Sequence, residues 1–438
     1  MNDEIHAVAE WDPLTVSEAL ARQLAYARSL PWFRALCPQI LHVQSPQDLH
    51  RLPMQAVEDD LGGVLSCAMA EASHCAPGGG LTLTSGGSTG QRKHITHSWA
   101  FNARIVSLGA RVFGAADERP AVVINCLTAG EMQGAFQYAA ALVERIGARL
   151  LPAGSLMGLV RIAELIHAQT VDALICTPSF AAALFNHQDI DVEQLASLRW
   201  LYYIGEPCSK QLREQLARDW PAIKIRSLGY SSTETGPIGY QCQHLEHGFY
   251  HLHADAMLLE VVDPLTLQAV AEGEAGEFLL TPLLADHVPL LRYRIGDRGR
   301  ILRQGSNCAC GSPLPVLELE GRVETSIKLG GAIITQRQVL SVLRQALPDL
   351  NAVDLQMQIE RQAGGVRMLV VIARDKLPAG AESAIERELH SDERACALLR
   401  LPGVLGLQVQ RLERHEFETN LAGKTPFFFE LGDTPMTR

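Results

Sequence analysis

The chain has 438 residues, which is too long for one hydrophobic core, so we expect two or three domains. Hydrophobic residues make up 47% of it and charged residues 20%, as in an ordinary soluble globular protein. The net charge of −11, from 38 basic and 49 acidic side chains, argues against nucleic acid and anionic membranes as partners, because both attract a basic surface.

The first residues, Met1–Ile5, are acidic and lack the apolar stretch of a signal peptide. No run of about 18 apolar residues appears anywhere, so no membrane span is expected. Ten cysteines are scattered along the chain, and Cys308 and Cys310 form the one close pair. This usage favours a reducing compartment, and we expect a cytoplasmic protein.

In chain order, helical patterns over residues 15–30 and from Pro31 come first and are interpreted as scaffold. Leu81 and Leu83 then alternate with Thr82 as in a strand, ahead of a glycine-rich loop. Beyond that loop, amphipathic helices alternate with short apolar strands. The expected helices cover 98–112, 134–146, 158–169, 179–185 and 209–219, and the expected strands cover 121–125, 148–152, 173–178, 198–204 and 223–229.

This alternation predicts an α/β domain with a largely parallel sheet, whose ligands bind at the carboxyl ends of its strands. Two polar segments, Gly205–Pro207 and Gly229–Glu234, follow such strands. Short strands and turns over 248–302 predict a smaller β-rich subdomain. A third unit is expected past Gly321, with strands near 355–359 and 367–372 and helices near 336–346 and 381–389.

The loop after the first strand is rich in glycine, hydroxyl side chains and cations. It contains Thr84, Ser85, Gly86, Gly87, Ser88, Thr89, Gly90 and Lys93. Glycines let backbone amides approach an anion closely, and the hydroxyl groups and Lys93 add further donors. We interpret the loop as a phosphate cradle, although it lacks the ending of a P-loop. A flexible linker is the alternative.

Five motifs follow one another in an order that resembles the adenylate-forming superfamily of acyl- and aryl-CoA ligases, adenylation domains and luciferases. They are Thr84–Lys93, Gly229–Glu234, Tyr293–Asp297, Gly321–Lys328 and Asn420–Lys424. The chain is most similar to phenylacetate–CoA ligase-like proteins. Residues 31–34, 52–53, 205–207 and 308–311 carry that closer resemblance. Ser231, Glu324 and Asn420 depart from the usual residues without removing a catalytic group.

The resemblance implies an α/β fold with a large N-terminal domain of mainly parallel sheets with helices, over residues 1–322. Its β-rich subdomain would cover about residues 240–320. A small, mobile α+β lid domain over residues 323–438 would carry the catalytic lysine and rotate about Glu324 between two half-reactions.

The resemblance also implies that the chain joins a carboxylic acid to AMP with release of pyrophosphate, and then transfers the acyl group to a thiol. Lys424 would bridge the carboxylate and the α-phosphate, Thr233 would bond the α-phosphate, and Glu234 would hold Mg²⁺. Thr84–Gly90 and Lys93 would hold the ATP phosphates. The nucleotide pocket would contain Gly205, Glu206, Pro207, Gly229, Tyr230, Ser231, Ser232, Asp297 and Arg322. The alternatives are a helix cap for Glu234, a turn for Asp297 and a solvated tail for Lys424.

Some relatives bind structural zinc through three cysteines and one histidine. The matching set here is Cys242, His251, Cys308 and Cys310, with His247 as the alternate histidine. Free thiols and surface histidines remain the other interpretation.

The substrate acid is less defined. Asn125, Glu131, Gln133 and Gly134 occupy the place of the aryl pocket in phenylacetate ligases, but the segment lacks aromatic residues until Phe136. Glu131 and Gln133 therefore favour a larger or more polar acid, such as a hydroxylated aryl acid or an amino acid, unless Glu131 faces solvent.

Several functions stay open at this stage. The acceptor is CoA or the phosphopantetheine of a carrier protein, as in stand-alone adenylating enzymes of secondary metabolism, or an amine. A non-catalytic binding protein on the same fold is a further alternative. The sequence leaves the oligomeric state open, a homodimer included.

Overall fold

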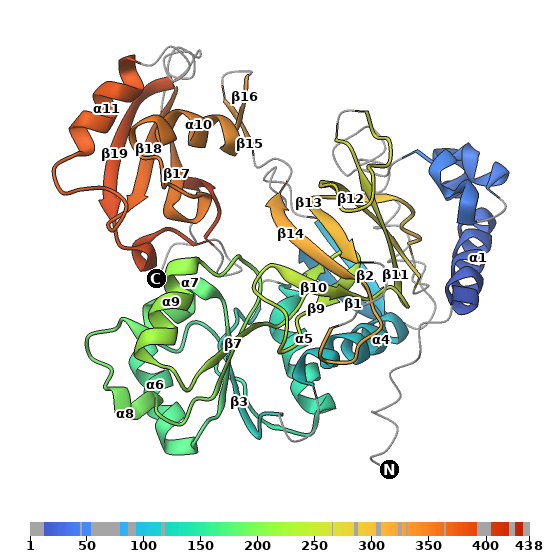
Figure 1. The fold of residues 1–438 in the computed structure, drawn as a ribbon, viewed down its shortest axis with the longest axis horizontal. Helices are drawn as coiled ribbons and strands as arrows, with labels where there is room; N and C mark the ends of the chain where they lie inside the picture. The colour runs from blue at the N-terminus through green and yellow to red at the C-terminus, as the bar shows by residue number, and fades with distance from the viewer. Residues whose placement is uncertain are drawn as a thin grey trace.

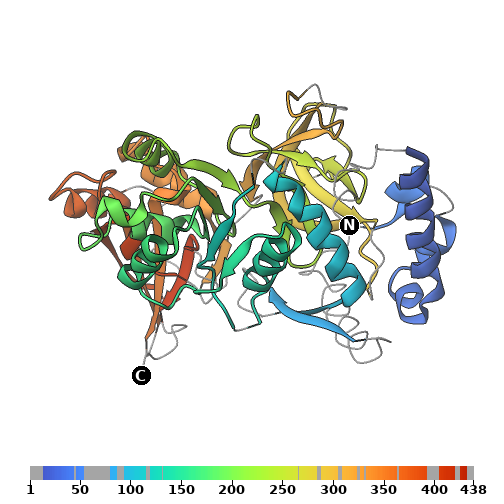
Figure 2. The same cartoon turned by 90° about the horizontal axis from the view of Figure 1, so that it is seen from below.

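The computed structural model describes residues 13–43, 46–53, 79–85, 93–114, 119–130, 132–264, 266–283, 288–303, 308–322, 326–329, 332–362, 365–391, 404–419 and 425–431. Figure 1 shows a parallel and an antiparallel sheet side by side, with a C-terminal unit above the helices of the parallel sheet. Figure 2 gives the second view, in which the first helix and the C-terminal unit again lie at opposite ends of the molecule.

The parallel sheet has five strands in the order β4-β3-β5-β6-β7. Their bounds are β3 Val122–Asn125, β4 Arg149–Leu151, β5 Ala173–Cys176, β6 Trp200–Tyr203 and β7 Lys224–Ser227. Every residue of β5 and β6 is buried, because helices cover both faces of a parallel sheet. The connecting helices are α5 Gly134–Arg145, α6 Leu159–Gln169, α7 Pro178–Phe185, α8 Val192–Leu195 and α9 Lys210–Asp219.

The two faces of this sheet have separate cores. Leu201 and Tyr203 pack toward the face covered by α6, α7 and α9. Trp200 and Tyr202, which alternate with them along β6, pack toward α5 and the preceding helix α4, Trp99–Gly109. The period of two along β6 thus sends consecutive side chains into opposite cores.

The antiparallel sheet has seven strands in the order β11-β12-β13-β14-β10-β9-β8. Their bounds are β8 Tyr230–Ser232, β9 Gly236–Tyr240, β10 Phe249–Leu252, β11 Met257–Val262, β12 Gly276–Pro282, β13 Tyr293–Arg303 and β14 Val316–Arg322. Two residues, Leu228 and Gly229, separate β7 of the parallel sheet from β8 of this one. The chain therefore passes from one sheet to the other within the second predicted nucleotide motif.

Three smaller parts complete the structure. An antiparallel pair, β1 Gly80–Ser85 and β2 Lys93–Ser98, flanks the glycine-rich loop. Helices α1 Pro13–Ser29 and α2 Pro31–Leu36 share a core with Leu283 and Leu291. The C-terminal unit has the mixed sheet β19-β18-β17-β20 and the hairpin β15-β16. Its elements are β15 Ser326–Leu329, β16 Ala332–Thr335, α10 Gln336–Ala346, β17 Leu355–Gln362, β18 Gly365–Ala373, α11 Glu382–Ser391, β19 Val404–Leu412, the 3₁₀ turn η7 Arg414–Glu416 and β20 Phe428–Leu431.

The predicted α/β class and the helix–strand alternation over 98–229 are confirmed, with element ends shifted by a few residues. The β-rich part is larger than the short strands suggested, since β8–β14 span residues 230–322 and their sheet is entirely antiparallel. The domain boundary at residue 322 stays a prediction. Among the helices that the structure describes, none is long and apolar enough to cross a membrane.

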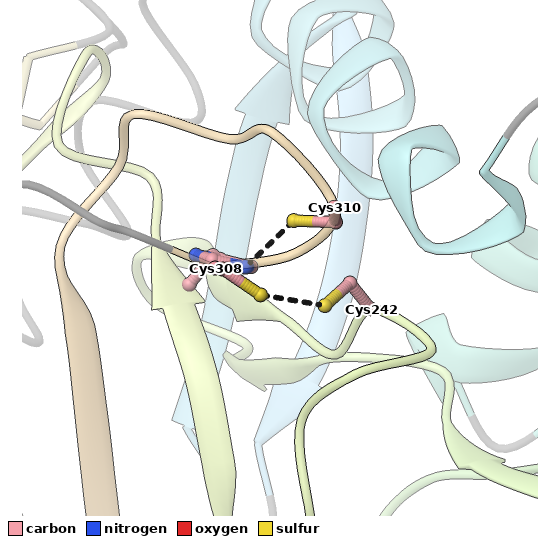
Figure 3. A group of neighbouring side chains, drawn as sticks. Cys242, Cys308 and Cys310 are labelled. Carbon is pink, nitrogen blue, oxygen red and sulfur yellow. Dashed lines mark hydrogen bonds between the residues drawn. The ribbon is translucent and has the colours of Figure 1, made fainter.

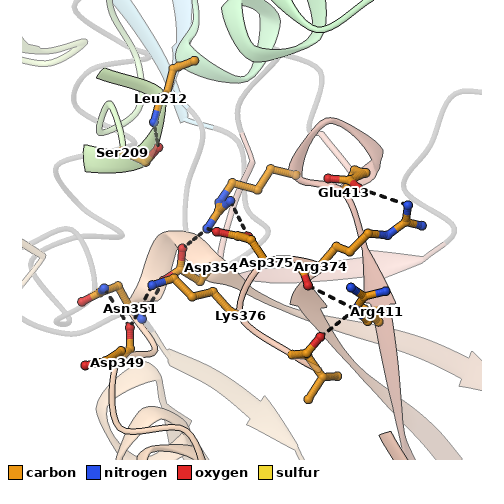
Figure 4. Close-up of polar contacts among 12 residues, drawn as sticks. Ser209, Leu212, Asp349, Asn351, Asp354, Arg374, Asp375, Lys376, Arg411 and Glu413 are labelled. Carbon is orange, nitrogen blue, oxygen red and sulfur yellow. Dashed lines mark hydrogen bonds and ion pairs between the residues drawn. The ribbon is translucent and has the colours of Figure 1, made fainter. Parts of the chain in front are cut away.

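A buried carboxylate organises one end of the C-terminal sheet (Figure 4). Asp354 is fully buried, and its Oδ1 accepts from the guanidinium of Arg414. Its Oδ2 accepts from the backbone N of Asn351 at 2.9 Å and lies 4.0 Å from Nζ of Lys376. Arg414 also donates to Asp375 at 2.7 Å. This network joins η7 to the 3₁₀ turn η6, Ala352–Asp354, just before β17, and to the turn after β18.

We expect Asp354→Asn to lower the free energy of unfolding by about 3 kcal/mol, because it leaves the partly buried Arg414 without its main counter-charge. Urea denaturation of the full chain measures this. The matched control is Glu360→Gln, which removes an exposed ion pair with Arg367 at 3.8 Å and should change stability by less than about 0.5 kcal/mol. Equal effects of the two substitutions would contradict the structural role of Asp354.

Candidate functional site

Two of the predicted nucleotide segments lie at the same edge of the parallel sheet. β6 and β7 are parallel neighbours, with Tyr203 opposite Ser227, so the segments that follow them leave the sheet side by side. Gly205 has φ +98°, a conformation that favours glycine, and begins the turn that contains Glu206 and Pro207. Glu206 is half-buried in this turn, whereas its two neighbours are exposed.

The structure brings Tyr230 and Asp297 together although 67 positions separate them. The Tyr230 hydroxyl donates to Oδ2 of Asp297 at 2.8 Å, and the Tyr230 ring is 6% exposed. Asp297 lies on β13 opposite Arg322 on β14. Three residues predicted to bind the nucleotide, Tyr230, Asp297 and Arg322, therefore come from β8, β13 and β14 of the antiparallel sheet.

Thr233 and Glu234 form the tight turn between β8 and β9. Ser232 stabilises this turn, because its Oγ accepts from the backbone N of Thr235 at 3.1 Å. The carbonyl oxygen of Thr233 lies 2.6 Å from Nε2 of His97 on β2. His97 is buried and stacks on Phe101 at 4.5 Å.

His97 is thus a site neighbour that the sequence analysis missed. The local sequence around His97 could not predict this role, because its contact with Thr233 joins residues 136 positions apart.

The Glu206 carboxylate accepts hydrogen bonds from two separate segments of the chain. Its Oε1 accepts from the backbone N of Ser179 at 2.7 Å, and its Oε2 accepts from the backbone N of Thr425 at 2.9 Å. The hydroxyl groups of Ser179 and Thr425 lie 2.7 Å apart. Thr425 directly follows Lys424 in the sequence. Sequence reasoning singled out neither Ser179 nor Thr425.

The start of the glycine-rich loop lies against the predicted acid segment. The backbone N of Thr84 donates to the carbonyl of Met132 at 2.9 Å. A Cβ on Gly134 would lie 2.8 Å from a terminal methyl of Leu83, so a larger residue would require Leu83 to shift. Gln133, half-buried, immediately precedes α5.

Asn125 at the end of β3 is fully buried, and both ends of its amide bond the main chain. Its Nδ2 donates to Phe136 at 3.0 Å and its Oδ1 accepts from Leu127 at 3.1 Å. These bonds give Asn125 a clear role in shaping the loop that leads to α5, and its contact with substrate stays a prediction.

Several predicted site residues lie outside the described residues. They are Gly86, Gly87, Ser88, Thr89, Gly90, Glu131 and Lys424, together with the hinge residue Glu324. Ser85, Lys93 and Arg322 are described by their backbone alone.

The proposed metal ligands converge from three neighbouring parts of the antiparallel sheet (Figure 3). Cys242 follows β9, His251 lies on β10, and Cys308 and Cys310 lie between β13 and β14. One ligand atom from each of the four lies within 4.8 Å of the others. Sγ of Cys242 is 3.6 Å from Sγ of Cys308, and Sγ of Cys310 is 3.2 Å from Nε2 of His251.

These distances fit a tetrahedral zinc site. Zn–S bonds of about 2.3 Å put two thiolates about 3.8 Å apart at a tetrahedral angle. Backbone N–H groups of His244 and Ser312 approach the sulfurs of Cys242 and Cys310, both at 3.4 Å, and such donors favour thiolate. Nδ1 of His251 lies 3.3 Å from the carbonyl of Leu314, which orients the ring as in known metal sites.

His247, the alternate histidine, lies elsewhere. Its Nδ1 contacts the Tyr203 hydroxyl in a pocket of about 380 Å³ that Arg213 also lines. Burial, and secondarily the charge of Arg213, lower the pKa of His247 from its ordinary value of 6.5 to about 4.

Comparison with known proteins agrees with this geometry. Residues 81–281 match the family model described as AMP-binding enzyme. Residues 81–281 form an AMP-binding domain of the adenylate-forming superfamily. The predicted resemblance is confirmed, and the AMP-binding domain contains the parallel sheet and the first strands of the antiparallel one.

The chain is also similar to phenylacetate–coenzyme A ligases. It is 27% identical over 271 residues to the one from Thermus thermophilus, which covers 61% of this chain and 59% of that protein. It is 27% identical over 162 residues to the one from Escherichia coli strain K12, covering 36% and 37%. The matches thus span about three fifths or less of these curated relatives.

Solved structures share the fold. A 2-hydroxyisobutyryl-CoA ligase in the postadenylation state, in complex with 2-HIB-AMP, superposes with a TM-score of 0.62 at 18% identity over 95% of this chain and 86% of that one. ATP-bound MatB from Rhodopseudomonas palustris has a TM-score of 0.52 at 16% identity, covering 78% and 65%.

The lowered pKa of His247 predicts a pH-dependent stability. Between about pH 6.5 and pH 4 the unfolded histidine binds a proton that the folded one does not, so the free energy of unfolding falls on acidification. From pH 7 to pH 5 we expect His247 to contribute a loss of about 2 kcal/mol. Urea denaturation at both pH values should show a smaller loss for His247→Gln than for the parent chain. The exposed control, His42→Gln, should keep the full loss.

Proposed function

We propose that this chain is an AMP-forming acid–CoA ligase. One observation carries the proposal: the structure places side chains of separate superfamily motifs in contact, with Tyr230 of one bonded to Asp297 of another. The backbone N of Thr425, next to the motif lysine, donates to Glu206, which follows β6 of the parallel sheet. The similarity to phenylacetate–CoA ligases supports the same reaction class.

The first half-reaction joins the acid to AMP. A carboxylate oxygen of the acid attacks the α-phosphorus of ATP, the bond to the bridging oxygen breaks, and pyrophosphate leaves. Lys424 stabilises the charge shared by the carboxylate and the α-phosphate, and Thr233 donates to the α-phosphate. Glu234 would hold Mg²⁺, a hard cation that would neutralise charge on the phosphates when bound.

The nucleotide itself is held by the residues around these groups. Asp297 accepts from the ribose hydroxyls, and Tyr230 both orients Asp297 and lies against adenine. The glycine-rich loop, Thr84–Lys93, supplies donors to the β- and γ-phosphates. Arg322, opposite Asp297 on the neighbouring strand, is the residue we assign to ribose or phosphate.

The second half-reaction releases AMP. A thiolate attacks the acyl carbon of the adenylate, the acyl–oxygen bond breaks, and a thioester forms. We infer CoA as the acceptor because the curated relatives are named as coenzyme A ligases. The substrate is inferred to be an aryl or polar aryl acid, which would approach the segment from Asn125 to Gly134. Seven described cysteines are free thiols, which supports a reducing compartment such as the cytoplasm.

The test is ATP–pyrophosphate exchange with a panel of aryl, fatty and amino acids and no CoA, followed by thioester formation with CoA or a phosphopantetheinylated carrier protein. We expect exchange with aryl acids, and Lys424→Ala should lower it at least about 100-fold. The same variant should form thioester normally from a supplied acyl-adenylate.

An equal loss in both half-reactions would contradict the role of Lys424. Exchange with amino acids, coupled to a carrier protein, would favour an adenylating enzyme of secondary metabolism. ATP binding by calorimetry without exchange for any acid would favour a non-catalytic binding protein.

We also propose that Cys242, His251, Cys308 and Cys310 hold one structural Zn²⁺. The donor geometry supports this assignment. The ion would link the segment after β9, strand β10 and the segment between β13 and β14. When bound, the ion supplies cross-linking rather than catalysis, because four protein ligands complete its tetrahedron.

The purified chain should contain about one zinc per polypeptide by elemental analysis. Cys308→Ser should lose the metal and lower the melting temperature, since binding energy of a structural ion is folding energy. The matched control is Cys126→Ser, a buried thiol outside the cluster, which should retain zinc. Full zinc occupancy in Cys308→Ser would contradict the assigned ligand set.

A further inference from the structure

One hydrogen bond and one hydroxyl pair connect the C-terminal unit to the carboxyl edge of the parallel sheet. They join Glu206 and Ser179 of the large domain to Thr425, which follows Lys424. We propose that Glu206, Ser179 and Thr425 form a latch that holds the segment after Lys424 in its position for adenylation. This inference rests on the proposed function and makes Ser179 and Thr425 positioning residues.

The large-domain side of the latch is held by contacts within that domain. Ser179 lies in the first turn of α7, where backbone N–H groups have no partner within the helix. Oε1 of Glu206 accepts from the Ser179 N at 2.7 Å, and a carboxylate at a helix N-terminus is also favoured by the helix dipole. The side chain of Thr177 caps the same helix by accepting from Phe180 at 3.2 Å. Glu206 is thereby oriented with Oε2 toward Thr425.

The C-terminal side is equally well anchored. The buried Gln356 on β17 donates to the carbonyl of Pro426 at 3.1 Å. Two residues later β20 begins and pairs with β17, with Phe428 opposite Met357. The dipeptide Thr425–Pro426 is therefore bonded to Glu206 on one side and to the C-terminal sheet on the other.

A second contact between the two bodies lies close by. The turn η7 lies against α7, the helix that carries Ser179. Arg414 of η7 is bonded to the buried Asp354, so this contact too is built on the C-terminal sheet. Both contacts meet the same helix, and together they define one orientation of the C-terminal unit on the large domain.

The latch has a consequence for catalysis. Lys424 is one residue from an atom bonded to Glu206, so the latched orientation keeps its segment at the edge of the sheet where the nucleotide motifs lie. If thioester formation uses a second orientation of the C-terminal domain, as the proposed function implies, these bonds have to break first. Glu206 thus acts on the lysine segment rather than on adenine alone.

The first test separates the two half-reactions. Thr425→Val and Ser179→Ala should each lower ATP–pyrophosphate exchange roughly 5-fold, because each removes the hydroxyl pair and leaves the main chain intact. The double variant should lose no more than either single one. Thioester formation from a supplied acyl-adenylate should be unchanged. Thr266→Val, which removes an exposed hydroxyl far along the antiparallel sheet, is the matched control.

An equal loss in both half-reactions, or additive losses in the double variant, would overturn the latch. Exchange that stays at the parent rate in both single variants would overturn it as well.

The second test does not depend on activity. The variant Ser179→Cys with Thr425→Cys should form a disulfide under mild oxidation, detected by mass spectrometry of the full chain, since the native oxygens are 2.7 Å apart. The single variant Ser179→Cys reports any pairing with the buried Cys176 or Cys208. The cross-linked chain should keep exchange and lose thioester formation until dithiothreitol restores it.

The outcomes distinguish this inference from the proposed function. A disulfide without exchange in the parent chain for any acid would refute the ligase reaction while leaving the contact established. Exchange in the parent chain without any disulfide in the double variant would refute the latch alone. Full thioester formation by the cross-linked chain would also refute it.

Discussion

The candidate site depends on the short connection from β7 to β8. β7 is the edge strand of the parallel sheet and β8 the edge strand of the antiparallel sheet, and only Leu228 and Gly229 separate them. Such a connection forces the carboxyl edge of one sheet against the end of the other. The loop after β6 and strand β8 thus follow neighbouring parallel strands. From β8, Tyr230 bonds Asp297 on β13 at 2.8 Å.

The second constraint is the position of the C-terminal unit. A catalytic lysine on a separate unit is useful only if that unit can be placed precisely and then released. Hydrogen bonds suit this task better than a large apolar interface, because they are directional and each contributes modestly to the free energy. The contacts of Glu206 and Ser179 with Thr425 have this character. The buried Asp354–Arg414 pair, by contrast, stays inside the C-terminal unit.

The Cys/His cluster lies away from these contacts and has a different physical role. Its ligands follow β9, lie on β10 and precede β14, three strands that neighbour one another in the antiparallel sheet. A metal there would restrain long loops that carry few apolar side chains. The sequence predicts His251 as the ligand and leaves His247 as the alternate histidine. The structure separates them, since Nε2 of His251 lies 3.2 Å from Sγ of Cys310 and His247 contacts Tyr203.

The sequence by itself determined the fold class, most helices and strands over residues 98–229, and the order of the superfamily motifs. These follow from local patterns, such as the apolar run of β5 and the glycines after β1, which need no knowledge of distant contacts. The extent of the antiparallel sheet was not predictable, because β8, β9 and β10 are short and their pairing is set by partners far along the chain. Likewise, the bond between Glu206 and Thr425 joins residues 219 positions apart. Only the tertiary structure decided that Glu206 meets the lysine segment and that His97 supports Thr233, because such contacts result from the packing of whole sheets and helices rather than from any residue spacing.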